Sequence, residues 1–298
     1  MKLGIVVVYL VKPDDGSLLE LHLSQIARNT TVPYRLYAAT ERLLPALVSR
    51  LREFPQACLC PCEPTELRGA RENTHYLEQL VRFALEDGVT HICALHPDSF
   101  PVRPGWAEAM VDLCAPDGAV CAIQRVENHD LKPQTCGLLF SSDWYLRYRP
   151  GFLLTAEQRA SEQYKRYQAA VPHIADSGSG FGFSLWCAGL QWAPLNRSNR
   201  AQDHALLGSV YGDLIFHLGA ASHERFTLNL DGRINRWTAR TLRGFWDQGR
   251  HVLYGRAQEE RRNAAAYARI REALLRDPEG YLHYLRSGTA LRTPRTVD

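Results

Sequence analysis

The sequence predicts an α/β fold in which helices flank a mixed, mainly parallel sheet and a helical appendage follows toward the C-terminal end. Apolar strand-like runs alternate with amphipathic helical stretches through residues 1–115, which is typical of parallel sheets built from strand–helix–strand units. Two strand-like runs then follow each other without a long helix between them, which indicates an antiparallel pair. From about Asn235 onward the pattern is helical and rich in arginine. We therefore expect a main domain over residues 1–232 and a helical appendage over residues 233–298.

The first half of the chain begins with an apolar run at residues 3–11, LGIVVVYLV. We interpret this run as a buried strand rather than a signal segment, because no small-residue cleavage site follows it. The pattern Ser17-x-x-Glu20 predicts a capping box that begins a helix through Arg28. The next expected elements are a strand at Tyr34–Ala39, a helix over Leu44–Leu51, a short strand at Cys58, a helix at Tyr76–Leu85 closed by Gly88, a strand at Val89–Leu95 and a helix from Gly105.

The second half departs from this alternation. The two strands of the expected antiparallel pair are Ala119–Val126 and Cys136–Ser141. A capping box, Thr155-x-x-Gln158, predicts a polar helix that runs to about Ala170. The remaining expected elements are a glycine-rich segment from Asp176, a helix toward Ala188, strands at Leu190–Leu195 and Tyr211–His217, and C-terminal helices whose clearest part is Ala264–Leu275.

Composition excludes several classes of protein. A formal net charge of +3 is weak, so bulk charge does not indicate a nucleic-acid-binding protein. Most of the eight cysteines stand in apolar runs, where a free thiol packs as a small hydrophobe, and we therefore expect a reducing compartment, the cytoplasm. Cys58, Cys60 and Cys62 lack a second Cys/His pair at zinc spacing, so alternation in a short strand is favoured over a zinc site. No apolar run is long enough to span a membrane.

The stretch from Val89 to Trp106, VTHICALHPDSFPVRPGW, is the strongest functional signal. A buried strand ends in the polar, turn-forming segment His96-Pro97-Asp98-Ser99. Ligand sites of open α/β sheets lie at the carboxyl ends of strands, so Asp98 is the first candidate site residue. The structural alternative is that Asp98 only caps the loop before Ser99 and Pro101.

The same region carries a family resemblance. Asn73, the motif Leu95-His96-Pro97-Asp98 and the motif Pro104-Gly105-Trp106 together resemble the GT-A fold of family 2-like glycosyltransferases, over roughly residues 3–225. The resemblance implies a nucleotide-binding half at 1–115 and an acceptor half at 116–232. One departure is that His96 stands where the family has the first aspartate of its acidic motif.

The resemblance implies a divalent cation, Mn²⁺ or Mg²⁺, that bridges the diphosphate of a nucleotide-sugar donor. A cation acting as a Lewis acid stabilises the diphosphate that leaves. Asp98 is the implied retained ligand, and His96 can replace the missing aspartate because imidazole also binds such ions. A further ligand is expected late in the chain, with His217 as the first candidate and His223 as its competitor.

The resemblance also implies a general base for inverting transfer, and Asp176 matches its position before a helix and Gly189. Ala175 replaces the glutamate that usually precedes it, and an N-cap or Asx-turn role for Asp176 stays open. Glycines 178, 180 and 182 are expected to let the loop lie close to substrate or sheet. The implied nucleotide-sugar contacts are Tyr9, Glu41, Arg71, Asn73, His96 and Asp98, while Trp144 and Tyr145 are candidates for stacking on an acceptor sugar or for buried packing.

The expected function is therefore a metal-assisted, inverting glycosyltransferase of the hexosyl- or pentosyltransferase class. Two alternatives stay open. One is a non-catalytic nucleotide- or sugar-binding protein of the same fold, which the histidine in the acidic motif makes credible. The other is a transferase whose acceptor is a polyanion such as nucleic acid, for which the arginine-rich C-terminal helices would provide contacts.

Overall fold

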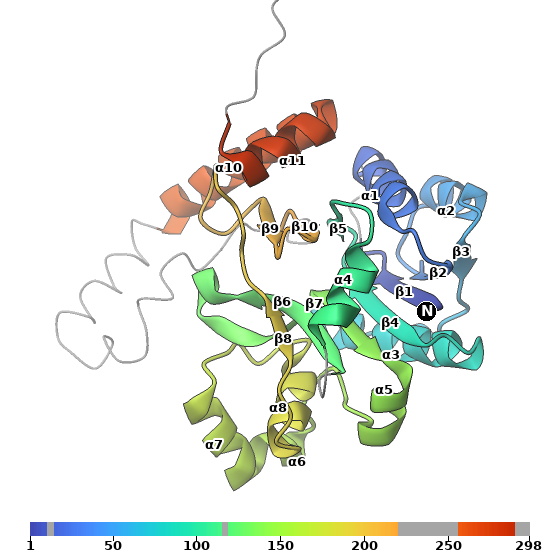
Figure 1. Ribbon diagram of the computed structural model, residues 1–298, viewed down its shortest axis with the longest axis vertical. Helices are drawn as coiled ribbons and strands as arrows, with labels where there is room; N and C mark the ends of the chain where they lie inside the picture. Colours follow the sequence, from blue (N-terminus) through green and yellow to red (C-terminus); the bar gives the residue numbers. More distant parts are fainter. Residues whose placement is uncertain (11–14, 115–118, 220–255, 290–298) are drawn as a thin grey trace, which may run out of the picture.

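The computed structural model describes residues 1–10, 15–114, 119–219 and 256–289. Within these residues seven strands form one sheet in the order β3-β2-β1-β4-β7-β6-β8 (Figure 1). The strands are β1 (Leu3–Val8), β2 (Tyr34–Ala39), β3 (Ala57–Leu59), β4 (His91–Leu95), β6 (Val120–Arg125), β7 (Asp130–Ser141) and β8 (Ala193–Leu195). Strands β1 to β4 pair in parallel, and β7 runs antiparallel to both β4 and β6. The predicted mixed, mainly parallel sheet is thus confirmed.

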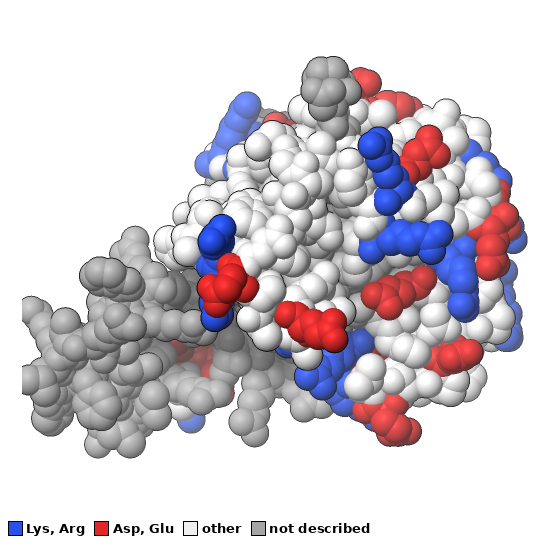
Figure 2. Space-filling model, turned by 90° about the horizontal axis from the view of Figure 1, so that it is seen from below, with Lys and Arg blue, Asp and Glu red and all other residues white. Residues whose placement is uncertain are grey.

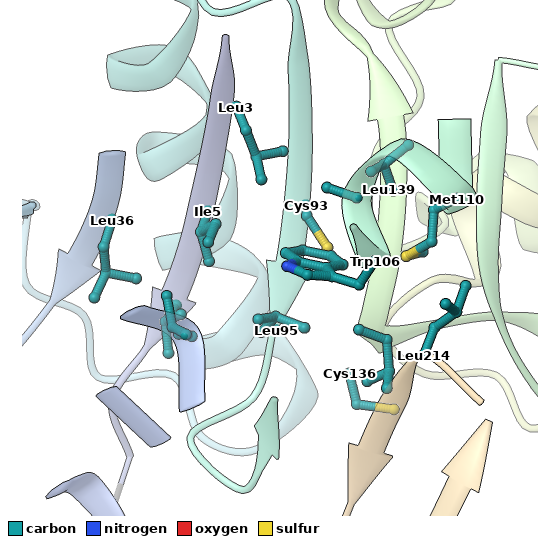
Figure 3. Packing of buried hydrophobic residues seen from close by; sticks show 14 of the residues in the cluster. Leu3, Ile5, Leu36, Cys93, Leu95, Trp106, Met110, Cys136, Leu139 and Leu214 are labelled. Carbon is teal, nitrogen blue, oxygen red and sulfur yellow. The ribbon is translucent and has the colours of Figure 1, made fainter. Parts of the chain in front are cut away.

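Helices cover both faces of this sheet. Leu3, Ile5 and Val7 of β1 pack on one face with helices α1 (Gly16–Asn29), α2 (Pro45–Glu53) and α4 (Trp106–Leu113). Figure 3 shows Trp106 of α4 lying over Cys93 and Leu95 of β4 on this face. Val6 and Val8 point to the other face and pack with α3 (Ala70–Glu86), α5 (Ser142–Tyr148) and α8 (Ser179–Cys187). Coverage of both faces explains why β1 is apolar at consecutive positions rather than alternating.

A second, three-stranded sheet of order β5-β10-β9 holds the candidate site. Its strands are β5 (Ser99–Pro101), β9 (Ser209–Tyr211) and β10 (Ile215–His217). The C-terminal helices α10 (Arg256–Arg276) and α11 (Pro278–Ser287) form one hydrophobic cluster with this sheet and with α1. Arg271 of α10 forms an ion pair with the buried Asp15 at 2.9 Å. The C-terminal helices therefore support the back of the small sheet.

Several expected element boundaries were wrong. Helix α1 begins at Gly16 with no side-chain capping bond, so the capping box at Ser17 and Glu20 is not formed. The expected strand from Tyr211 to His217 is a hairpin, because Gly212 and Asp213 adopt φ values of 58° and 56° and turn the chain between β9 and β10.

Two further corrections concern the second half. The Thr155–Gln158 capping box is confirmed, but its helix stops early as α6 (Ala156–Ala160), and Ser161 then caps a separate helix, α7 (Glu162–Ala170). Strand β7 begins at Asp130, well before the expected start at Cys136, and a 3₁₀ turn at Val126–Asn128 joins it to β6. The early part of β7 was missed because its polar residues and Pro133 do not read as a buried strand.

Candidate functional site

A tight turn after β4 places His96 and Asp98 at the carboxyl end of the central parallel strands. The backbone N–H of Ser99 donates to the carbonyl of His96 at 3.0 Å, and the backbone N–H of His96 donates to Oγ of Ser99 at 2.8 Å. Strand β5 starts at Ser99 and pairs with β10, where His217 is the residue opposite Ser99. The backbone N–H of Leu218 also donates to the carbonyl of Asp98 at 2.9 Å. This register places His217 beside Asp98, although the two residues are far apart in the sequence.

The side chains of His96, Asp98 and His217 converge. One potential ligand atom from each lies within 4.8 Å of the other two, and within the described residues this is the one cluster of at least three such side chains. Nε2 of His217 lies 3.6 Å from Oδ1 of Asp98, and the two imidazole rings meet edge to face at 5.9 Å between centroids. The structure therefore brings together all three predicted metal ligands. The competitor His223 lies outside the described residues.

This group of atoms suits a metal ion. Asp98 and His217 are buried and His96 is half-buried, so the cluster is largely sheltered from solvent. Nε2 of His96 is hydrogen-bonded to Oγ1 of Thr135 at 3.1 Å, a contact of the kind that fixes the ring orientation of a metal-binding histidine. Two imidazoles and one carboxylate form a mixed donor set that favours a transition-metal ion over Mg²⁺, which prefers oxygen ligands.

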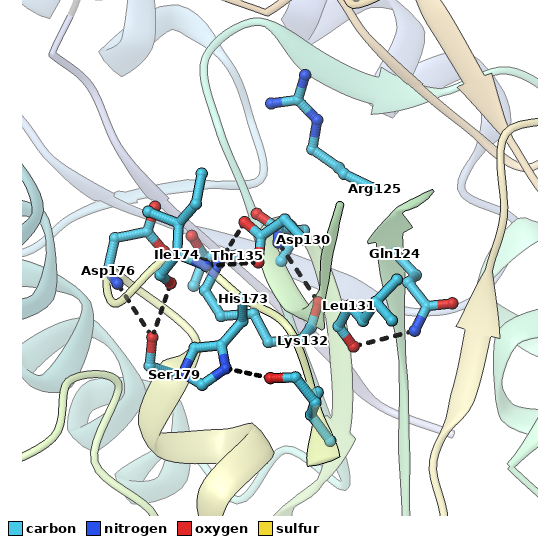
Figure 4. A network of polar contacts seen from close by, with 12 residues as sticks. Gln124, Arg125, Asp130, Leu131, Lys132, Thr135, His173, Ile174, Asp176 and Ser179 are labelled. Atoms are coloured by element: carbon cyan, nitrogen blue, oxygen red, sulfur yellow. Dashed lines mark hydrogen bonds and ion pairs between the residues drawn. The ribbon is translucent and has the colours of Figure 1, made fainter. Parts of the chain in front are cut away.

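Asp176 forms an ion pair with a buried lysine. Nζ of Lys132 lies 2.7 Å from Oδ1 of Asp176 and 2.8 Å from Oδ2 of Asp130 (Figure 4). The Lys132 side chain is 0% exposed, whereas that of Asp176 is 41% exposed. Burial raises the pKa of Asp176, and the Lys132 ammonium opposes this shift. Asp176 therefore has a raised pKa, and solvent or a substrate can still reach its carboxylate.

Sequence reasoning missed Lys132 and Asp130. The available signal was their rarity, because Lys132 is one of four lysines in the chain and alternates with Asp130 on one face of a strand. Oδ1 of Asp130 accepts from the backbone N–H of Ile174 at 3.2 Å, so the pair also holds the turn that carries Asp176. The backbone N–H of Asp176 donates to Oγ of Ser179 at 3.0 Å within that turn.

The glycine-rich segment packs against the edge of β7. Gly178 has φ of 94°, and a Cβ at this position would lie 2.2 Å from the carbonyl oxygen of Pro133. A Cβ on Gly180 would lie 2.0 Å from the carbonyl oxygen of Gly151. The expected close approach of this loop to the sheet is therefore found, and only glycine permits it at these positions.

The other candidate contacts have different surroundings. Tyr9 is fully buried with its ring edge-on to His22, so it presents no free face to a nucleotide base. Glu41 is exposed just beyond β2. Nδ2 of Asn73 donates to Oγ of Ser177 at 3.5 Å, which links α3 to the turn of Asp176. Arg71 is exposed two residues earlier on the same helix.

Trp144 and Tyr145 belong to an aromatic cluster rather than to an open surface. Trp144 is buried, with its ring centroid 5.6 Å from that of Phe181, and Tyr145 stacks on Phe140 at 5.3 Å. Of the two interpretations, buried packing is the correct one for Trp144. The half-buried Tyr145 is likewise held by Phe140.

Comparisons with known proteins give partial structural similarity. No protein-family model matches the chain, and no curated protein matches its sequence. Among solved structures, the mannosyltransferase PcManGT from Pyrobaculum calidifontis, in complex with GDP-Man and Mn²⁺, is 17% identical over 50% of this chain and 47% of its own, with a TM-score of 0.38. S. aureus TarS 1–349 is 12% identical over 53% of each chain, with a TM-score of 0.37. A longer S. aureus TarS structure is 15% identical over 53% of this chain and 32% of its own, with a TM-score of 0.35. The chain thus spans about half of these proteins, or less.

Proposed function

We propose that the protein is a metal-assisted glycosyltransferase that takes a sugar from a nucleotide-diphospho-sugar. The observation that carries this proposal is the convergence of His96, Asp98 and His217 at the strand ends. His96 lowers the pKa of Asp176 through its charge, so the candidate base and the metal-ligand cluster lie within electrostatic range of each other. A cation site and a reachable carboxylate are the two groups that inverting sugar transfer requires.

The metal-ligand cluster would act on the leaving group. His96, Asp98 and His217 would hold the cation, which supplies Lewis-acid stabilisation of the diphosphate when it is bound. Because two of the three donors are imidazoles, we propose a transition-metal ion rather than Mg²⁺, with Mn²⁺ as the candidate that the resemblance implies. Asp98 contributes the one negative charge of this donor set.

Asp176 would act on the acceptor. Its carboxylate takes the proton of an acceptor hydroxyl while that oxygen bonds to the anomeric carbon, and the sugar–phosphate bond breaks with its electron pair going to the nucleotide diphosphate. Attack from the face opposite the leaving group inverts the anomeric centre. Lys132 and Asp130 are positioning residues, since they fix the carboxylate and its turn from the buried side.

The proposal assigns the donor nucleotide to residues 1–115 and the acceptor to residues 116–232. The C-terminal helices contribute by packing against β9 and β10, and β10 presents His217. All eight cysteines lie in the described residues and are free, which supports a cytoplasmic location as part of the proposal. Separately, none of the helices in the described part of the chain is both long and apolar enough to cross a membrane.

The acceptor is the least constrained part of the proposal. On the face of the molecule shown in Figure 2, basic and acidic side chains of the described residues are interspersed. This face therefore lacks the continuous basic surface over which a polyanion such as nucleic acid binds. A non-catalytic binding protein is the second candidate function, because His96 replaces an acidic residue in the motif that the resemblance implies.

One experiment separates the two functions. Hydrolysis of UDP- and GDP-sugars is measured with and without Mn²⁺ for the wild-type chain, for Asp98→Ala and for Asp176→Asn. A transferase shows slow Mn²⁺-dependent hydrolysis that Asp98→Ala abolishes. Binding of a nucleotide sugar without turnover, with and without a panel of sugar acceptors, would instead identify a binding protein.

A further inference from the structure

A cavity lined by arginines lies beside the turn that carries Asp176. It has a volume of about 270 Å³, and its wall is formed by Arg68, Ala70, Arg71, Leu153, Leu154, Arg159, Ala175 and Ser179. Ala175 and Ser179 flank Asp176 in the sequence, and Oγ of Ser179 accepts the hydrogen bond from the backbone N–H of Asp176. The cavity therefore lies next to the candidate base, Asp176.

The charge of this cavity is positive. Three of its lining residues are arginines and none is acidic. Arg71 and Arg159 form no ion pair with any described residue, and Arg68 has only Glu66 at 3.9 Å. Arg71 of α3 and Arg159 of α6 thus have no carboxylate partner among the described residues, and Arg68, in the loop before α3, also donates to the backbone carbonyls of Thr65 and Leu67. The three guanidinium groups repel one another unless an anion lies between them.

Two helices also begin at this wall. Ala70 is the first residue of α3, and Ser179 is the first residue of α8. Neither helix has a side-chain capping bond at its N-cap, although the backbone N–H groups of Ser179 and Gly180 in α8 already donate to the carbonyls of Asp176 and Phe152. The positive end of each helix dipole adds to the field of the arginines. The feature is thus a cavity with three cationic side chains, reinforced by two helix N-termini.

We propose that this cavity binds a phosphate group carried by the acceptor. Arg68 and Arg71, although they belong to residues 1–115, would then contact the acceptor, in place of the nucleotide-sugar contact that the resemblance implies for Arg71. The inference rests on the proposed transferase function for its role, because it makes the acceptor a phosphorylated molecule whose hydroxyl reaches Asp176. A phosphate carries about −1.5 to −2 charges and three acceptor oxygens, which matches three guanidinium groups better than the single charge of a carboxylate does. The donor diphosphate has its own binding group in the metal-ligand cluster, which is formed by the turn between β4 and β5 and by β10.

The test measures binding of inorganic phosphate to the full chain by calorimetry, in a chelator-treated buffer without nucleotide. The wild-type protein is expected to bind phosphate saturably at one site. Arg71→Gln and Arg159→Gln are each expected to weaken binding roughly tenfold or more, since each removes a charge-assisted hydrogen bond. Arg166→Gln is the matched control, because Arg166 is an exposed arginine on the neighbouring helix α7 that does not line the cavity.

Two results would overturn the proposal. One is the absence of saturable phosphate binding to the wild-type chain, and the other is equal affinity of Arg159→Gln and Arg166→Gln. Arg159 is exposed on the short helix α6, so its substitution keeps the test valid if Arg71→Gln fails to fold. Acetate is the second probe, and acetate binding as tight as that of phosphate would assign the cavity to a carboxylate instead.

A further arm separates an acceptor phosphate from the donor diphosphate. Phosphate affinity is measured again with saturating Mn²⁺ and GDP or UDP. An unchanged affinity supports a separate acceptor subsite, whereas displacement of phosphate by the nucleotide would place the cavity in the donor site and contradict the proposal. If no nucleotide binds at all, the transferase function fails, while the metal-free phosphate titration still decides whether the cavity is an oxyanion site.

Discussion

Asp98 and His217 meet across the ladder between β5 and β10, with Nε2 of the histidine 3.6 Å from Oδ1 of the aspartate. More than a hundred residues separate them in sequence, yet the pairing of His217 with Ser99 fixes their distance through backbone hydrogen bonds. The metal-ligand cluster is therefore held by the tight turn between β4 and β5 and by β10 rather than by a loose loop. Because the cluster is held rigidly, the contribution of each of its residues to metal affinity can be measured by substituting that residue.

Removal of one imidazole should weaken metal binding strongly. We expect His217→Ala to lower the Mn²⁺ affinity by more than the roughly 10–100-fold that loss of a residue orienting a metal ligand costs. Calorimetric titration with Mn²⁺ measures this change. His283→Ala is the control, because His283 is exposed on α11 and does not belong to the metal-ligand cluster. Equal Mn²⁺ affinity of the two variants would contradict the assignment.

Substitution of the candidate base should separate chemistry from metal binding. We expect Asp176→Asn to lower the transfer rate by roughly 10²–10⁴-fold, the usual contribution of a general base, while the Mn²⁺ affinity stays the same. Initial rates with a nucleotide sugar and an acceptor measure the effect. Asp143→Asn, an exposed aspartate on α5, is the control and should keep wild-type rates. Full transfer by Asp176→Asn would remove Asp176 from the mechanism.

The pH dependence of transfer follows from the surroundings of Asp176. The base works only when it is deprotonated, and burial raises its pKa despite the opposing charge of Lys132. The rate should therefore begin to fall, on acidification, at a higher pH than the ordinary carboxyl pKa of about 3.9 would give. A pH profile of kcat/KM measures this limb, and a profile that stays flat down to the ordinary carboxyl range would argue against Asp176 as the base.

The parallel half of the fold and the metal-ligand cluster could both be predicted from sequence, because local apolar pattern locates the strands and therefore also the residues at their ends. Strand β1 is apolar throughout, and β2 and β4 are apolar apart from Arg35 and His91, so the positions of these strands follow from local pattern alone, and Asp98 follows from its place just after β4. His217 was predicted because it ends an apolar run, although that run proved to be a hairpin. The turn before β10 did not affect this prediction, because His217 is the last residue of β10 with or without it.

The ion pairs that hold Asp176 could not be predicted from local sequence pattern. Lys132 is charged in sequence and looks like a solvent-exposed residue, but its partners Asp130 and Asp176 come from β7 and from a distant turn. Burial of a lysine depends on tertiary partners that no local pattern contains. Tyr9, which the resemblance implies as a nucleotide contact, is likewise placed by tertiary structure, because its ring is buried edge-on to His22 of α1.

Removal of the buried ammonium should destabilise the fold. Lys132→Met leaves Asp130, which is buried, with no cationic partner among the described residues, and we expect a loss of roughly 3–5 kcal/mol in the free energy of unfolding. Denaturant titration measures this loss. Lys165→Met is the control, since its ion pair with Glu162 is exposed and should contribute at most about 1 kcal/mol. A similar loss in the free energy of unfolding in both variants would contradict the stabilising role of the buried ion pair between Lys132 and Asp130.

Two glycine substitutions separate steric overlap from backbone strain. Gly178 and Gly189 both have positive φ values, of 94° and 66°, but only at Gly178 would a Cβ meet backbone, the carbonyl oxygen of Pro133 at 2.2 Å. Gly189→Ala should therefore cost about 1–2 kcal/mol of stability from strain alone. Gly178→Ala should cost more and should also lower the transfer rate, because the turn of Asp176 has to move. Equal stability and equal rates in the two variants would show that the turn tolerates displacement.

A buried histidine should make stability depend on pH. His22 is fully buried in α1, and burial lowers its pKa to about 4, with the charge of Asp98 opposing the shift. Because the folded-state pKa lies below the ordinary value of 6.5, the unfolded chain binds this proton first as the pH falls. The contribution of neutral His22 to stability is therefore complete above pH 6.5 and is lost as the pH falls toward about 4.

The measurement is the free energy of unfolding at several pH values between about 4 and 7. In this range His22→Gln should flatten the slope by up to about 1.4 kcal/mol per pH unit, which is the value of one proton taken up on unfolding. His283→Gln removes an exposed histidine and should keep the wild-type slope. The slope is the decisive quantity, because a buried glutamine lowers stability at every pH without changing its pH dependence. Parallel curves for wild type and His22→Gln would show that His22 is already protonated in the folded chain or that it titrates as it does when unfolded.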